Sequence, residues 1–249
     1  MMVRFPMRVT AGILAAAAIV SVGCKSGGSS RDQILDELAN LEKETIYEQA
    51  EALYEDKQYA KAREFFGFVY DSFPNDPLGH KAALRVADTF AAKKDVTSLT
   101  EARLRYRDFA NRYPNDPDRD YALLMVGHTY SARKMRPDRD LSDIQEALAA
   151  YQQLINIYPN SQYATEGEAR INDLLELLAE HEWQVAKFYL RNKRYLGALW
   201  RLEYLRENYG SFSQMDAVNV KISEIESLIE QRDKEWKKRL EELQKETQD

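Results

Sequence analysis

The sequence predicts an all-α protein built from stacked helical hairpins, and three observations support this fold class. A short phrase recurs as FPNDP at 73–77, YPNDP at 113–117, YPNS at 158–161 and, more weakly, YGS at 209–211. Successive copies lie 40, 45 and 51 residues apart, a spacing typical of helical repeat proteins. Only ten Gly and seven Pro occur in the 249 residues. The sequence also lacks the sustained alternation of apolar and polar residues that would indicate a strand. Such repeats usually form a binding scaffold, because each must bury its apolar face on its neighbours.

The N-terminal segment 1–23 has the pattern of an export signal. Arg4 and Arg8 precede an apolar stretch over 11–22, which is shorter than the about 20 residues that span a bilayer. Cys24 follows and is the only cysteine, which excludes an intramolecular disulfide and leaves a modified cysteine, a free thiol or an intermolecular disulfide. We interpret residues 24–32 as the modified cysteine and a flexible tether.

Four hairpins are predicted within a solenoid over 33–212. In each, a small residue on the first helix faces an Ala on the second, so that the helix axes can approach, and the second helix ends at the boundary phrase. The pairs are Ala50 with Ala62, Ala87 with Ala102, Gly127 with Ala147, and Ala186 with Ala198. The members of a pair stand equally far apart in the first and fourth hairpins, but further apart in the second and furthest in the third. This difference predicts inserts in the second and third hairpins, which we take as the cause of the unequal intervals. Ser98 and Ser142 have capping-box spacing at the starts of two second helices.

Residues 213–249 are predicted to form a long amphipathic helix with a charged tail. Apolar residues follow a three-four spacing there, and neither Gly nor Pro interrupts them. The first turns should cap the last hairpin, and a degenerate fifth repeat remains an alternative.

The composition and motifs favour a protein that is not an enzyme and holds no cofactor. A formal net charge of −6 disfavours nucleic acid as a partner. His80, His128 and His181 are far apart in sequence, and no pair has metal-ligand spacing. We find no nucleophile motif, phosphate loop or paired-carboxylate site.

The small and large positions of the hairpins resemble the tetratricopeptide repeat over about residues 43–210. In that repeat, certain first-helix positions usually line the concave side, where aromatic and apolar side chains suit an extended peptide. Ordinary contacts between repeats are the alternative role for these side chains. The candidate groove residues are Tyr47, Tyr54, Leu84, Asp88, Leu124, His128 and Trp183.

The sequence SVGC at 21–24 resembles the processing box of bacterial lipoproteins. The resemblance implies that the signal 1–23 is removed and that Cys24 carries a covalent lipid, with a diacylglycerol on its sulfur and an acyl chain on its new amino group. Lys25 after the cysteine suggests passage to the outer membrane.

Three segments together resemble the BamD family of outer-membrane β-barrel assembly lipoproteins. They are the run Asp138, Arg139, Asp140, the phrase YPNSQY at 158–163 and the stretch WQVAKFY at 183–189. The resemblance implies a non-catalytic subunit on the periplasmic face of the outer membrane. Its partners would be the periplasmic domains of the barrel-forming subunit, other assembly lipoproteins and unfolded outer-membrane proteins, with the loop at 138–140 as a candidate docking site.

Two other functions remain open from the sequence. A pilus-biogenesis lipoprotein that escorts a secretin would also be built from tetratricopeptide units. A cell-wall-associated regulator of peptidoglycan enzymes would belong to a different class of protein.

Overall fold

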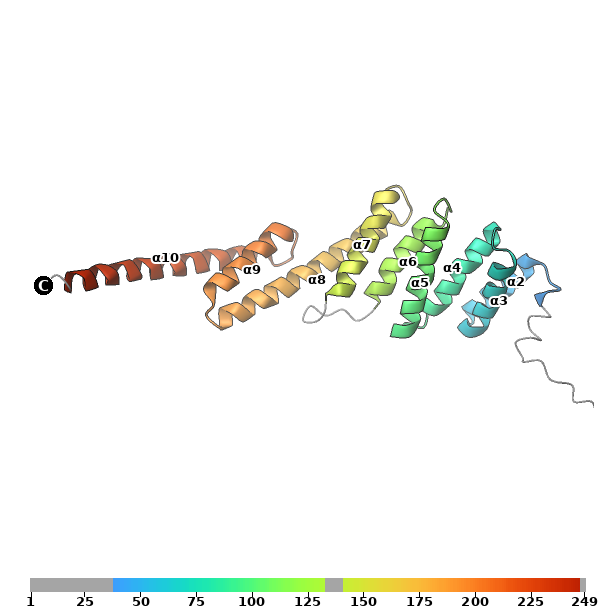
Figure 1. Cartoon of the computed structure of the whole chain (residues 1–249), viewed down its shortest axis with the longest axis horizontal. Coiled ribbons are helices and arrows are strands. Elements are labelled where there is room, and N and C mark those ends of the chain that lie inside the picture. The colour runs from blue at the N-terminus through green and yellow to red at the C-terminus, as the bar shows by residue number, and fades with distance from the viewer. Residues whose placement is uncertain (1–37, 133–140, 247–249) are drawn as a thin grey trace, which may run out of the picture. The chain divides into compact units, whose positions relative to one another are not determined.

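The computed structural model describes residues 38–132 and 141–246, and these are helical with short turns, which confirms the all-α prediction. A compact unit over Leu41–Asp249 contains the helices of the described residues (Figure 1). They are α2 (Lys43–Glu55), α3 (Tyr59–Ser72), α4 (Pro77–Ala91), α5 (Val96–Arg112), α6 (Arg119–Ser131), α7 (Ser142–Ile157), α8 (Ala164–Arg191), α9 (Tyr195–Asn208) and α10 (Met215–Glu246).

Each helix packs against the next one in the chain, as expected for a solenoid of hairpins (Figure 1). The hairpins are α2–α3, α4–α5, α6–α7 and the C-terminal half of α8 with α9. All eight small residues of the predicted pairs are buried, so the close approach of the helix axes is confirmed.

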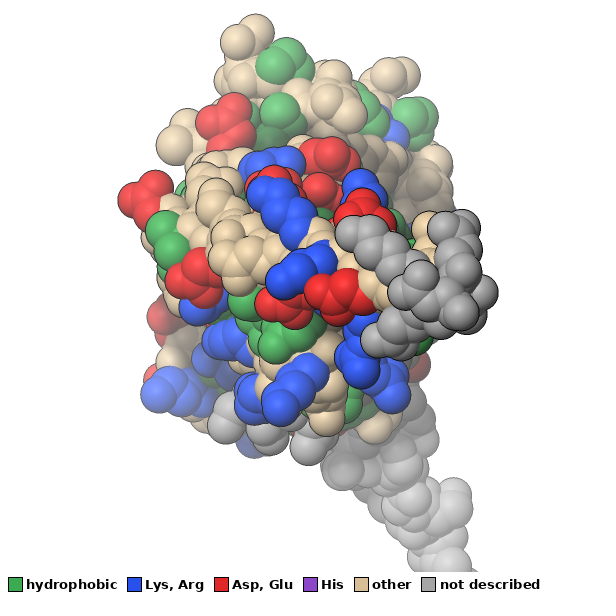
Figure 2. Space-filling view, turned by 90° about the vertical axis from the view of Figure 1, so that its left-hand side faces the viewer, with side chains coloured by type: hydrophobic (Ala, Val, Ile, Leu, Met, Phe, Trp, Pro, Cys, Tyr) green, Lys and Arg blue, Asp and Glu red, His purple; other side chains and the backbone are tan. Residues whose placement is uncertain are grey.

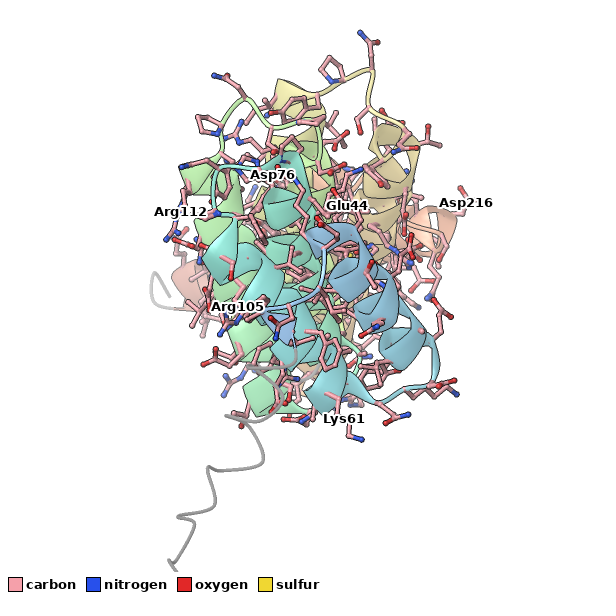
Figure 3. The ribbon with its side chains drawn as sticks, turned by 90° about the vertical axis from the view of Figure 1, so that its right-hand side faces the viewer. Glu44, Lys61, Asp76, Arg105, Arg112 and Asp216 are labelled. Carbon is pink, nitrogen blue, oxygen red and sulfur yellow. The ribbon has the colours of Figure 1, made fainter. Side chains whose placement is uncertain are left out.

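The recurring phrase ends one hairpin and starts the next. In its first copy Asp76 caps α4, since its Oδ1 accepts a hydrogen bond from the Leu78 amide at 2.8 Å, and Pro77 occupies the first helical position. This turn and the turn within the first hairpin lie at opposite edges, as the positions of Asp76 and Lys61 show (Figure 3).

The insert in the second hairpin takes the form of extra helix. Asp95 caps α5 by accepting a hydrogen bond from the Ser98 amide at 2.9 Å, and α5 begins at Val96. The expected capping box at Ser98 is therefore wrong, because Ser98 already lies inside the first turn. The second helix of the third hairpin begins at Ser142, where a start was expected, but Leu141 is its N-cap residue, so the capping box expected at Ser142 is also wrong. The insert of this hairpin lies outside the described residues.

The predicted inserts do not explain the longest interval between copies of the recurring motif, the one from YPNS at 158–161 to YGS at 209–211. In the second and third hairpins, the small residue of the first helix lies equally far after the proline of the preceding motif. In the fourth hairpin, Ala186 lies about twice as far after Pro159. The roughly 14 additional residues lengthen α8 by about 21 Å at about 1.5 Å per residue. One continuous helix therefore serves two cores, with Leu174 and Leu178 in the first and Ala179, Trp183 and Ala186 in the second.

The predicted long C-terminal helix is confirmed. Val218, Ile222 and Ile225 are buried in the second core, whereas Trp236 and Leu240 are exposed beyond it. Because α10 is unbroken from Met215 to Glu246, a fifth hairpin does not form among the described residues. Within 38–132 and 141–246, no helix combines the length and the apolar character that crossing a bilayer requires.

Candidate functional site

The first helices of successive hairpins together line one hollow of about 270 Å³. Because α2, α4 and α6 are all first helices, this is the side of the solenoid on which the sequence places a peptide groove. On α4 the lining residues follow a spacing of three and four, so they share one helix face. The lining residues are Tyr47, Lys81, Leu84, Arg85, Asp88, Asp118, Tyr121 and Tyr163.

Arg85 is fully engaged within the wall of this hollow. Its guanidinium donates to both carboxylate oxygens of Glu51, with the Nε bond at 2.8 Å, and to Asp88 Oδ2 at 2.9 Å. It also lies 4.0 Å from the ring centroid of Tyr54. Burial alone would lower the pKa of Arg85, but the hydrogen bonds to Glu51 and Asp88 raise it. The arginine therefore links α2 to α4. Because its guanidinium is already paired with two carboxylates, it is not available to pair with a ligand.

Asp88 is the buried polar centre of the floor, with 4% of its surface exposed. Besides Arg85 it binds the hydroxyls of Tyr106 and Tyr121, which donate to Oδ1 at 2.5 and 2.8 Å. Burial, then the charge of Asp88, raises the pKa of both phenols well above the ordinary value. Both tyrosines therefore remain donors at neutral pH, and they tie α5 and α6 to α4.

The groups left available for a ligand lie around this fixed floor. Lys81 is exposed, and in the described part of the chain no carboxylate lies within ion-pair distance of it. The half-buried Tyr47, Tyr121 and Tyr163 present partly accessible rings, with the last two ring centroids 5.7 Å apart. Burial and the nearby Asp116 raise the pKa of Asp118. The hollow thus offers aromatic faces, one free cation and one carboxyl group.

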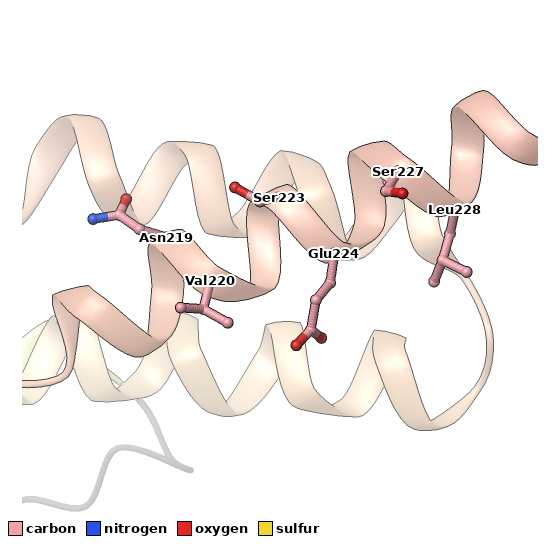
Figure 4. A pocket seen from close by; sticks show the side chains of 6 residues that line it. All are labelled: Asn219, Val220, Ser223, Glu224, Ser227 and Leu228. Carbon is pink, nitrogen blue, oxygen red and sulfur yellow. The ribbon is translucent and has the colours of Figure 1, made fainter.

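Other hollows have less suitable walls. One of about 240 Å³ lies among α3, α4 and α5, where Arg63 and Arg105 both approach the Phe90 ring. Another is lined by six residues of α10 alone, including Val220, Glu224 and Leu228, so it is an open helix face (Figure 4). Among the described residues, no group of three or more His, Cys, Asp or Glu side chains is placed to hold a metal ion.

Comparison with known proteins assigns the chain to a family. The model of YfiO, described as an outer membrane lipoprotein, matches residues 39–240. The chain belongs to this YfiO/BamD family. The outer membrane protein assembly factor BamD of Haemophilus influenzae is 25% identical over 207 residues, which cover 79% of this chain and 75% of that relative. The BamD of Rickettsia prowazekii is 27% identical over 192 residues, covering 77% and 72%.

Some relatives match over a shorter region. The BamD of Xylella fastidiosa is 37% identical over 81 residues, which cover 32% of this chain and 28% of that protein. The chain thus spans less than a third of the length of the first relatives that it matches. Membership of the YfiO/BamD family confirms the family resemblance and the prediction that the protein is not an enzyme. The family match includes every residue of the hollow.

The structure brings three of the predicted groove residues together. Tyr47, Leu84 and Asp88 line the hollow, and Tyr54 stacks on Arg85 beside it. Leu84 and Asp88 are buried and contribute mainly to its floor.

The other three predicted groove residues lie elsewhere. Leu124 is buried in the first core. His128 is half-buried, with Nε2 3.2 Å from Glu166 Oε1 but without hydrogen-bond geometry. Trp183 is buried in the second core, where its Nε1 donates to Gln214 at 3.1 Å.

Several residues of the hollow were missed, although their register could have revealed them. Lys81 and Tyr121 both stand seven residues after a boundary proline, and Asp118 and Tyr163 both stand four residues after one. These positions fall at the starts of the first helices, where successive hairpins converge on the hollow. Cys24 and the loop residues Asp138, Arg139 and Asp140 lie outside the described residues.

Proposed function

We propose that this protein is a non-catalytic, lipid-anchored subunit of the machinery that assembles outer-membrane β-barrel proteins. The description of the family as outer membrane lipoproteins and the naming of its relatives as outer membrane protein assembly factors support this role. Its partners are the periplasmic domains of the barrel-forming subunit, other assembly lipoproteins and unfolded barrel proteins.

The hollow supports the binding of an extended client segment. The hollow is lined by residues of α2, α4 and α6, and an extended chain rises about 3.3 Å per residue, so a short client segment reaches across it. A client laid across α2, α4 and α6 can therefore place an aromatic side chain on Tyr47, Tyr121 or Tyr163. Its acidic group pairs with Lys81, the cation that the Arg85 network leaves free. The observation that carries the proposal is that the polar groups on the floor of the hollow are paired with one another, whereas Lys81 and the tyrosine rings at its rim are accessible.

Client binding is tested with a fluorescent peptide from an unfolded barrel protein. Lys81→Glu and Tyr163→Ala should each weaken binding about tenfold, because they remove the free cation and one ring of the rim. Lys61→Glu is the matched control, since this exposed lysine lies on α3, outside the hollow (Figure 3). Equal affinity of all three variants and the unmodified protein would exclude the hollow as the client site.

The assembly role is tested separately in cells. The tagged protein should recover the barrel-forming subunit from detergent extracts, and its depletion should lower the levels of outer-membrane barrels. Recovery of a secretin or a peptidoglycan synthase, with normal barrel levels, would instead support one of the other two functions.

The lipid anchor has its own test. Cys24→Ser should leave the protein unprocessed or release it from the outer membrane, because the acylated sulfur is lost. Mass spectrometry of the membrane-bound protein measures the acyl groups. An acylated Cys24→Ser variant that remains in the outer membrane would contradict this assignment.

A further inference from the structure

The hairpin formed by α8 and α9 carries a long basic stretch in an otherwise acidic chain. Between Glu182 and Glu203 the sequence contains no acidic residue, although the whole chain has a net charge of −6. The same stretch contains five cations: Lys187, Arg191, Lys193, Arg194 and Arg201. These residues occupy the end of α8, the turn and the first half of α9.

The basic residues at the turn are the ones with free charge. Lys187 lies 3.8 Å from Glu180, and Arg201 donates to Glu182 at 2.9 Å. By contrast, Arg191, Lys193 and Arg194 are exposed and have no carboxylate within ion-pair distance in the part of the chain that the structure describes. Seen from the C-terminal end, Lys and Arg side chains gather along the lower edge of the molecule, the edge at which the α8–α9 turn lies in Figure 1 (Figure 2).

The turn has a fixed backbone. The Arg194 amide donates to the Tyr189 carbonyl at 3.0 Å, and the Lys193 amide donates to the Leu190 carbonyl at 2.9 Å. This is the Schellman arrangement that closes a helix, with Lys193 in the left-handed position at φ 56°. The cations therefore project from a defined turn.

Exposed apolar side chains accompany these cations. Phe188, Leu196 and Trp200 are 53%, 63% and 58% exposed. Leu196 and Trp200 lie one helical turn apart, on a face of α9 other than the one that buries Ala198. Aromatic rings beside Lys and Arg are typical of surfaces that meet the membrane interface.

Stabilisation of the helix end does not account for this combination. Cations near a helix C-terminus interact favourably with its dipole, but this effect does not require exposed rings. The turns of the first two hairpins have the residues EDK at 55–57 and KKD at 93–95. They therefore carry acids beside their lysines, and neither has a ring among the large exposed hydrophobic residues.

We propose that the α8–α9 turn docks on the surface of a bilayer that contains anionic phospholipids. Each Lys or Arg near such a surface contributes about 1 kcal/mol, and Phe188, Leu196 and Trp200 can enter the interface beside the headgroups. A protruding turn with unpaired cations fits a planar anionic surface, whereas the hollows described above do not include it. This contact would hold the body of the protein against the membrane at a second point, in addition to the anchor proposed at Cys24.

The test uses the chain from residue 25 onward, which lacks the proposed anchor but keeps the complete unit 41–249 and both cores. Co-sedimentation compares vesicles of phosphatidylcholine with vesicles that contain phosphatidylglycerol in equal amount. Binding should require phosphatidylglycerol and should weaken in high salt. Lys193→Gln with Arg194→Gln should reduce binding about 30-fold, the equivalent of two charges at about 1 kcal/mol each.

Matched variants make the outcome specific to this turn. Lys93→Gln with Lys94→Gln removes the same charge from the α4–α5 turn and should leave binding unchanged. Trp200→Ala should weaken binding, whereas Trp236→Ala, at an equally exposed ring on α10, should not. Absence of binding, equal binding to both kinds of vesicle, or equal effects of the two charge variants would overturn the proposal. Each of these results would leave the assembly role intact, because the assay contains neither client nor assembly subunit.

Discussion

Replacement of Gly127 by Ala tests the packing of the third hairpin directly. A Cβ atom at Gly127 would lie 2.4 Å from Cε1, 2.6 Å from Cζ and 2.7 Å from Cδ1 of Tyr151. Carbon atoms in favourable contact are about 3.5–4.0 Å apart. Tyr151 has little freedom to withdraw, since it is fully buried and its hydroxyl lies 2.8 Å from Ser131 Oγ. The additional methyl group must therefore push α6 and α7 apart.

The net effect of Gly127→Ala is the difference between two contributions. Overpacking a core typically costs about 1–3 kcal/mol, whereas Ala is favoured over Gly inside a helix by about 0.5–1 kcal/mol. Because the overlap exceeds an ångström and involves a buried ring, we expect a net destabilisation of about 1–2 kcal/mol. For a protein of this size, that lowers the melting temperature by roughly 2–8 °C.

Gly67→Ala is the matched control for the same substitution. Gly67 lies inside α3, and nothing lies within 4 Å of a Cβ placed there. The helix preference should therefore act alone and stabilise the protein by about 0.5–1 kcal/mol. Urea unfolding followed by far-ultraviolet circular dichroism compares the transition midpoints. If Gly127→Ala raises the midpoint as Gly67→Ala does, the proposed close approach of Gly127 and Tyr151 is refuted.

The sequence predicted the hairpins well, because small residues and turn phrases mark them locally. The length of α8 was not predicted. The fourth hairpin was placed by counting back from the YGS motif at its end, and additional residues near the N-terminus of α8 do not change that count. The extension is also close to four complete helical turns. The apolar face of α8 therefore returns to nearly the same direction after the extension, and Leu178 of one core is followed directly by Ala179 of the other.

The residues of the hollow could be predicted only in part, because they lie at different positions along the first helices. Repeat register placed Leu84 and Asp88 on the correct face, but it could not show that Asp88 is buried beneath Tyr106 and Tyr121. That arrangement depends on hydroxyl groups that reach across from α5 and α6. The register after the recurring proline places Lys81 at the hollow, but its availability follows only from the structure, in which Arg85 already pairs with Glu51 and Asp88.

Three further predictions concern single side chains. Lys57→Gly should raise the stability measured by urea unfolding by about 0.5–1 kcal/mol, because Lys57 has φ 60° and glycine avoids the left-handed penalty; a lower midpoint would contradict this. Asp88→Ala should destabilise the protein by about 2–4 kcal/mol, because buried Tyr106 loses its acceptor, and in the same unfolding assay adding Tyr106→Phe should cost less than the sum of the single changes. The third is a pH effect: burial lowers the pKa of His128, and the partly opposing charge of Glu166 does not reverse this. The unfolded state therefore binds a proton more readily, so the contribution of neutral His128 is present above about pH 6.5 and is lost as the pH falls towards the folded-state pKa. In urea titrations, the unmodified protein should lose more stability than the His128→Asn variant as the pH falls over this range. If the difference in stability between the two proteins does not change with pH, His128 does not titrate in this way.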